Sequence, residues 1–175
     1  FDIAVHGGTL AAVIIYFKDD LIRLAQAWLP WTNHRNQEDF NLGLNLIVAT
    51  MPIVLVGLIF SDLIAERNTS IESITWANLI FAGLLWLAFK FSPQTKNLLS
   101  LTVLTAVAIG CLQALAIFPG ASRSGMAITG ALLIGLNLKD SSKFAFLLSI
   151  PTILGALILM VLKDAFVLTV DDLMI

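Results

Sequence analysis

Hydrophobic residues fall in six long runs that short polar stretches separate. The runs cover residues 3–17, 42–60, 76–91, 101–118, 126–136 and 144–162. A helix that crosses the hydrocarbon core of a bilayer needs about 20 apolar residues, with a range of about 17–25. The second, fourth and sixth runs are long enough, and the third becomes so when Ile74 and Thr75 are included. The pattern predicts an all-α, polytopic membrane protein.

The fifth run, residues 126–136, is too short to cross a bilayer. It follows Pro119 and Gly120, which end the helix expected before them. We therefore expect residues 101–118 and 126–136 to form a broken or re-entrant helix pair. Such breaks are tolerated at membrane depth where protein buries the polar backbone or a cavity wets it.

Composition agrees with a membrane protein. The 175 residues are 58% hydrophobic and only 13% charged, whereas about 25% of residues in soluble domains are charged. The formal net charge is −2 and no basic run stands out, so we expect no nucleic-acid partner.

Basic residues are concentrated in three loops, at residues 18–41, 90–100 and 137–143. If these loops share one side of the membrane, that side holds seven of the 10 Lys and Arg residues in the chain: Lys18, Arg23, Arg35, Lys90, Lys96, Lys139 and Lys143. Positive residues favour the cytoplasmic side. We therefore expect these loops to be cytoplasmic.

Two segments of the chain resemble each other. FDIAVHGGTLAAVI at residues 1–14 matches FAFLLSIPTILGAL at residues 144–157. With the orientation above, the two copies run in opposite directions. This is the inverted-repeat arrangement, which often places a substrate site near the bilayer midplane. We expect a single membrane domain over residues 1–175. Because the chain begins with Phe1 and ends at VDDLMI, we also expect it to be a fragment of a longer protein.

The stretch FPGASRSGMAITG at residues 118–130 carries the strongest candidate site. Ser122 and Ser124 are suited to cap a helix that begins near Gly125. A helix N-terminus, hydroxyl groups and the Arg123 guanidinium all bind anions. A charge inside a membrane is a functional candidate by default. The alternative is that Arg123 pairs with a carboxylate as a structural strut.

Three further polar residues are candidates for the same site. Thr129 lies one turn into the following helix, where its hydroxyl either faces the pocket or bonds to its own helix. Gln113 either lines a cavity or holds helices together. His6, beside two glycines, is either a binding residue or a packing residue. We expect Gly130 and Gly135 to allow close helix packing. Metal-ligand spacings such as CxxC or HExxH are absent from the sequence.

Three motifs of this sequence, in order, resemble one enzyme family. PGASRSG, with Thr129 after it, is similar to the PGxSRSG signature of the BacA/UppP-type undecaprenyl-diphosphate phosphatases. FDIAVHGGTLAAVIIYF resembles the FxxxxHxGTLxAVxxYF segment of that family, and FAFLLSIPTILGA resembles its FxFLLxxPxxxGA segment.

The resemblance implies a multi-pass enzyme of the bacterial plasma membrane with inverted repeats and re-entrant helices. Such enzymes hydrolyse undecaprenyl diphosphate to undecaprenyl phosphate and inorganic phosphate, which recycles the lipid carrier of cell-wall synthesis and confers bacitracin resistance. It implies that Arg123 binds the diphosphate and that Ser122, Ser124 and Thr129 line the catalytic site. Gly120, Gly125, His6 and Gln113 are the expected substrate-binding residues.

The resemblance also implies a divalent cation, Mg²⁺ or Ca²⁺, whose ligands remain unassigned. The family has an upstream motif with a glutamate pair, which this chain lacks, so we expect the fragment alone to be inactive. A homodimer is one arrangement we consider.

The alternative function is a transporter or lipid flippase with an anion site at the midplane.

Overall fold

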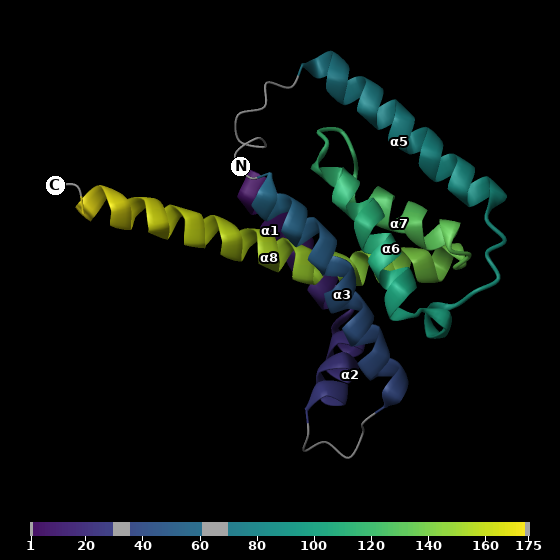
Figure 1. Ribbon diagram of the computed structural model, residues 1–175. Coiled ribbons are helices and arrows are strands. Elements are labelled where there is room, and N and C mark those ends of the chain that lie inside the picture. Colours follow the sequence, from purple (N-terminus) through teal and green to yellow (C-terminus); the bar gives the residue numbers. More distant parts are fainter. Residues whose placement is uncertain (1, 30–35, 61–69, 174–175) are drawn as a thin grey trace.

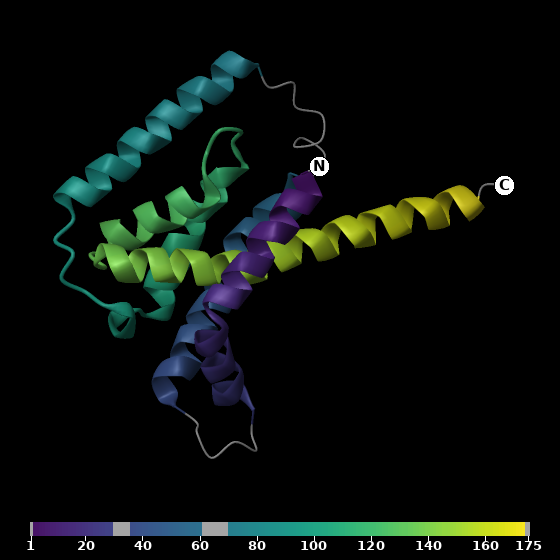
Figure 2. The same cartoon turned by 180° about the vertical axis from the view of Figure 1, so that it is seen from behind.

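The structure, a computed structural model, describes the backbone of residues 2–29, 36–60 and 70–173 and the side chains of residues 7–29, 36–60 and 70–158. The regular structure in these ranges is helical (Figures 1 and 2). The elements in chain order are α1 (Asp2–Tyr16), α2 (Lys18–Trp28), α3 (Gln37–Ile59), α5 (Ile71–Phe91), the 3₁₀ turn η1 (Leu98–Ser100), α6 (Val103–Ala114), the 3₁₀ turn η2 (Leu115–Ile117), α7 (Arg123–Leu133) and α8 (Leu138–Leu173).

Three described helices are long and apolar enough to cross a membrane: α3, α5 and the first part of α8, Leu138–Ile158. The expected all-α, polytopic class is confirmed. The expectation that the fourth run has spanning length is wrong, because Thr102 caps α6 and the chain turns at η2. The result is the shorter apolar segment Val103–Ile117.

Helix α6 lies at the centre of the packing, between α3 and α7. Its buried residues recur every three or four positions and are Ala106, Ile109, Gly110, Gln113 and Ala114. Gly110 lies so close to α3 that a Cβ there would come 2.3 Å from the carbonyl oxygen of Ala49. On the other side, a Cβ on Gly130 would lie 3.2 Å from the Cα of Ile109. Glycine therefore sets both helix–helix separations.

The two glycines predicted to pack helices differ. Gly130 does so, at the α6–α7 contact. Gly135 instead adopts φ +97° just after α7, where its amide donates to the carbonyl of Leu132. It is a left-handed residue that ends the helix, a conformation that glycine adopts without strain.

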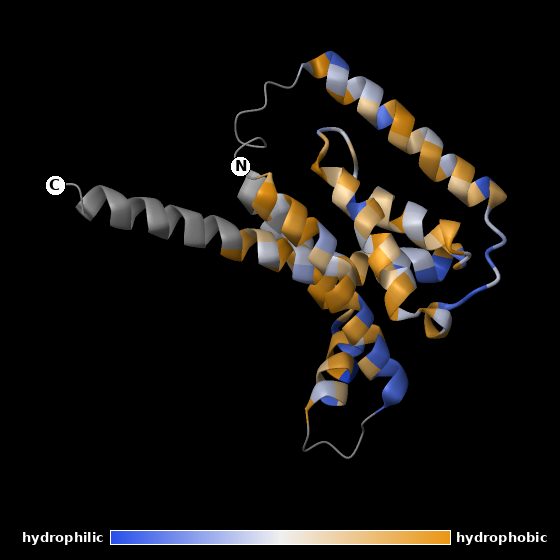
Figure 3. Ribbon diagram, in the orientation of Figure 1, coloured by the Kyte–Doolittle hydropathy of each residue, from blue (hydrophilic) through white to orange (hydrophobic). Residues whose placement is uncertain are grey.

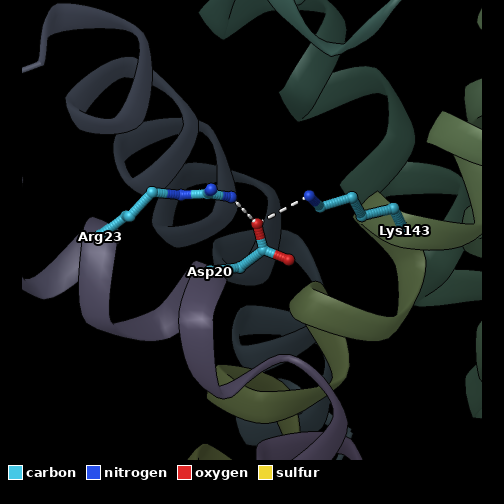
Figure 4. A network of polar contacts seen from close by, with 3 residues as sticks. All are labelled: Asp20, Arg23 and Lys143. Carbon is cyan, nitrogen blue, oxygen red and sulfur yellow. Dashed lines mark hydrogen bonds and ion pairs between the residues drawn. The ribbon is translucent and has the colours of Figure 1, made fainter.

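The basic loops meet at one end of the molecule, as the charge pattern predicts. Lys96 exchanges backbone hydrogen bonds with Gly135 and Asn137, which joins the loop after α5 to the loop after α7. The Lys143 ammonium donates to Asp20 at 2.7 Å, and Arg23 donates to the same carboxylate oxygen (Figure 4). Figure 3 shows hydrophilic residues gathered at the α2–α3 end and hydrophobic residues along α3 and α5.

Candidate functional site

A sharp turn delivers the chain to the start of α7. Gly120 has φ +93°, and a Cβ there would lie 2.5 Å from the carbonyl oxygen of Ile74 in α5. The hydroxyl of Ser122 then accepts a hydrogen bond from the amide of Gly125 at 3.2 Å and caps the helix. Helix α7 begins at Arg123, two residues earlier than predicted. Ser122 is thus the cap, and Ser124 belongs to the first turn.

Arg123 and Ser124 line a cavity of about 190 Å³ between α1, α6, α7 and α8. The other lining residues are Thr9, Val13, Gln113, Ala145, Phe146, Ser149 and Ile153. The Nη1 atom of Arg123 is buried, and no described residue forms a hydrogen bond with it. Arg123 as a whole is partly buried, but a buried N–H group of a cation without an acceptor costs free energy, so this cavity favours an anion.

The backbone of the first turn adds donors to this cavity. The backbone amides of Arg123 and Ser124 have no acceptor among the described residues. The amide of Gly125, in contrast, donates a hydrogen bond to the Ser122 hydroxyl. Free amides and the positive end of the helix dipole both attract negative charge.

The site lies near the middle of α5, a helix of membrane-spanning length. Phe81 is central in α5 and lines a cavity with Ser122 at the start of α7. On the other side of α7, the cavity residues Ala145 and Ser149 lie about two to three turns after the start of α8 at Leu138. The start of α7 therefore lies about halfway along α5.

The predicted site residues separate onto two faces of α7. Arg123, Ser124 and Gln113 line the cavity beside α8. Gly120, Ser122 and Gly125 line a second cavity of about 150 Å³ beside α5, together with Asn78, Phe81, Ala82, Leu85 and Met126. The hydroxyls of Ser122 and Ser124, 3.4 Å apart, connect the two faces.

Gln113 and Thr129 are both buried, with different surroundings. The Gln113 amide donates to the hydroxyl of Thr152 at 3.3 Å and also lines the Arg123 cavity, so both sequence interpretations hold for it. The Thr129 hydroxyl donates to the carbonyl of Gly125 at 2.7 Å, and Thr129 is not among the residues that line either cavity. The side chain of His6 lies outside the described residues.

Two polar residues of α8 were missed as site candidates. Ser149 lines the Arg123 cavity, and Thr152 accepts from Gln113. They flank Pro151, and their spacing of three residues in an apolar helix places both on one face. The sequence signal that could have identified them is that both are polar residues within an apolar run.

The described residues do not form a metal centre. Among them, no group of three or more His, Cys, Asp or Glu side chains lies close enough to hold a metal ion. Among the described residues, those that line the Arg123 cavity carry a guanidinium, hydroxyls and an amide but no carboxylate or imidazole. This set of donors fits an anion and does not fit a divalent cation.

Comparison with known proteins gives consistent matches. The profile of the family described as bacitracin resistance protein BacA matches residues 1–175. Proteins named undecaprenyl-diphosphatase are similar: that of Teredinibacter turnerae is 46% identical over 154 residues, 87% of this chain and 58% of the relative. That of Saccharophagus degradans is 44% identical over 153 residues, again 87% and 58%. That of Alcanivorax borkumensis is 44% identical over 157 residues, 89% and 59%. The chain thus spans under two thirds of these relatives' length.

Proposed function

The chain belongs to the BacA family of bacitracin resistance proteins, and from this premise we propose that the whole protein hydrolyses undecaprenyl diphosphate to undecaprenyl phosphate and inorganic phosphate. The similar proteins named undecaprenyl-diphosphatase support this proposal. We also propose that it resides in the bacterial plasma membrane, with the basic loops on the cytoplasmic side.

One observation carries the proposal. Arg123 has a buried Nη1 atom without a partner among the described residues, in a cavity that α8 lines with Ala145, Ser149 and their neighbours. A diphosphate would supply the missing negative charge. Its oxygens would accept from the guanidinium, from the amides of Arg123 and Ser124, and from the Ser124 hydroxyl.

The same donors can lower the barrier to cleavage. Negative charge builds on the phosphoryl oxygens and on the leaving group as the phosphoric anhydride breaks. Donors fixed in place before the reaction stabilise this charge without reorganising. Arg123 would bind that charge, and Ser122 would hold the helix start in position as its cap. Thr129 stays a predicted contributor to the site.

Activation of the nucleophile is not assigned to the described residues. The described residues that line the cavity offer no carboxylate or histidine to accept a proton, so we assign to them the binding of the diphosphate and the stabilisation of charge. A divalent cation, Mg²⁺ or Ca²⁺, remains part of the proposal for the whole protein, with ligands other than the described residues. No step is derived through it.

The test is phosphate release from undecaprenyl diphosphate by the purified full-length protein. We expect Arg123→Ala to lower kcat by about 10²–10³, the usual effect of removing one donor to a developing oxyanion. Arg123→Lys keeps the charge but loses the planar fork, so its activity should be intermediate. Arg23→Gln is the control, since Arg23 lies on α2 with 57% of its side chain exposed.

Undiminished turnover in Arg123→Ala would exclude the proposed role of Arg123. Absence of phosphate release from the unmodified protein under all cation conditions would favour the transporter or flippase alternative.

A further inference from the structure

A groove of about 780 Å³ lies between α1, α2 and the start of α8. It is lined by Thr9, Ala12, Val13, Tyr16, Phe17, Asp20, Lys139, Ser142, Lys143 and Phe146. The proposed phosphatase reaction does not use it. Its chemistry changes along its length: the α1 wall is apolar, whereas its far end carries two lysines, a serine and a carboxylate.

The charged end has more positive than negative charge. Asp20 is shared, because Lys143 and Arg23 both donate to its Oδ1 atom (Figure 4). Lys139 makes no hydrogen bond or ion pair with any described residue. Two lysines and one carboxylate therefore line this end of the groove, and the ammonium of Lys139 has no partner among the described residues.

The groove covers about a third of the length needed to cross a hydrocarbon core. Lys139, Ser142 and Lys143 lie in the first two turns of Leu138–Ile158. Thr9, Val13 and Phe146 line both this groove and the Arg123 cavity, so the two adjoin. From Lys139 to Phe146, the groove residues at either end on α8, the axis rises about 10 Å at 1.5 Å per residue. That is a third of a hydrocarbon core about 30 Å thick.

We propose that this groove binds one anionic glycerophospholipid from the leaflet on the side of the basic loops. The lipid phosphate accepts from the Lys139 ammonium and the Ser142 hydroxyl beside Lys143. An acyl chain lies along the apolar wall that Val13, Tyr16 and Phe146 provide. Basic pockets between membrane helices are a recurrent type of site for anionic head groups.

The charge distribution argues against a polyprenyl chain as the occupant. A polyprenyl diphosphate held by its head at Arg123 would place its apolar chain against Lys139 and Lys143. Burying ammonium groups against hydrocarbon costs free energy. An anionic head group at that end avoids this cost and pairs with the ammonium groups. The groove therefore fits a lipid whose head points away from Arg123.

Native mass spectrometry of the full-length protein tests the proposal. The detergent-purified protein is titrated with phosphatidylglycerol, with phosphatidylcholine of the same acyl chains, and with undecaprenyl phosphate. We expect tightest binding of phosphatidylglycerol. Lys139→Gln should weaken it about fivefold, the effect expected for one lysine near an anionic head group.

Two variants separate the roles of charge and shape. Lys90→Gln is the charge-matched control, because Lys90 lies on α5 with its ammonium 4.8 Å from the centre of the Trp86 ring. It should leave binding unchanged. Ala12→Trp fills the apolar wall without changing charge and should also weaken binding. Melting temperatures check that each variant is folded.

Equal binding of phosphatidylglycerol and phosphatidylcholine would overturn the proposal. An equal effect of Lys139→Gln and Lys90→Gln would do the same, as would tighter binding of undecaprenyl phosphate that Ala12→Trp abolishes. Because the readout is lipid binding rather than phosphate release, this test and the test of the proposed reaction can fail independently.

Discussion

Arg123 and Arg23 lie in opposite electrostatic surroundings. Arg23 has 57% of its side chain exposed and shares Asp20 with Lys143, which joins α2 to α8. Arg123 is partly buried, its Nη1 atom is buried with no partner among the described residues, and it lines a cavity with residues 145–153 of α8. A paired cation near solvent joins helices together. A cation with a buried, unpaired N–H group remains available for an external anion.

The free-energy costs of the two arrangements differ. An ion pair near the surface contributes only about 0–1 kcal/mol. A buried N–H group without an acceptor costs about 1–3 kcal/mol, and more where the group is charged. The fold tolerates Arg123 where hydroxyls, an amide and a helix start surround it. Because Arg123 is unpaired and Arg23 is paired, we propose an anionic ligand for Arg123 and a role in holding helices together for Arg23.

The largest effect should come from giving Arg123 an internal partner. Ser149→Asp places a carboxylate in the cavity that Arg123 lines. The new pair would neutralise the guanidinium, so phosphate release by the full-length protein should fall by about 10² or more. Ser149→Asn, of similar size but uncharged, is the control and should retain most activity. Equal losses in both variants would show that the free charge of Arg123 is not what matters.

A smaller effect should follow from displacing the turn that carries Arg123. Gly120→Ala must accommodate φ +93° and a Cβ 2.5 Å from the Ile74 carbonyl oxygen. We expect a cost of about 1–3 kcal/mol, seen as a lower melting temperature, and a fall in kcat of about tenfold as Arg123 shifts.

Gly83→Ala is the matched control for Gly120→Ala. It lies on α5, where a Cβ would meet nothing within 4 Å. Replacing a helical glycine by alanine there should be neutral or stabilising. If both variants behave alike, the close contact at Gly120 does not position Arg123.

Thr129→Val sharpens the role of the first turn of α7. It removes the hydrogen bond from the Thr129 hydroxyl to the Gly125 carbonyl, so we expect a loss of about 1 kcal/mol in stability. Phosphate release should change by less than in Ser149→Asp. A loss as large as that in Arg123→Ala would instead assign the hydroxyl a direct catalytic role, as the sequence motif predicts.

The smallest effect should come from the paired cluster. Asp20→Asn removes the carboxylate that Lys143 and Arg23 share. Because these side chains are partly exposed, we expect a loss of about 0.2–1 kcal/mol and unchanged kcat. A thermal melt and a turnover assay on the same preparation measure both. A collapse of kcat would mean that the two cationic centres are coupled.

Much of the fold follows from local sequence signals. The six hydrophobic runs all form helices, because their length and composition leave few alternatives in an apolar setting. The break at Pro119 and Gly120 and the cap at Ser122 were also predictable. The fourth run was predicted to have spanning length and to form a broken or re-entrant pair with residues 126–136. Its length was overestimated, because no residue type in the run marks the 3₁₀ turn that ends α6.

The membership of the site was predictable only in part. Each residue of an α-helix advances by about 100° around the axis. Starting α7 at Arg123 therefore directs Arg123 and Ser124 toward α8, and Ser122 and Gly125 toward α5. A motif specifies which residues are present, but the helix start and the neighbouring helices decide which of them share a cavity.

The sequence by itself determined that this is a helical membrane protein with an arginine, two serines and a helix start gathered at one break in an apolar run. It also placed the three basic loops on one side of the membrane, because Lys and Arg are concentrated in every second connection between the hydrophobic runs. Only the tertiary structure decided that Arg123 has a buried Nη1 atom without a partner, and that Ser149 and Gln113 join it. The physical reason is that burial and pairing depend on what other helices bring close, and residues distant in the chain carry no local signal of that contact.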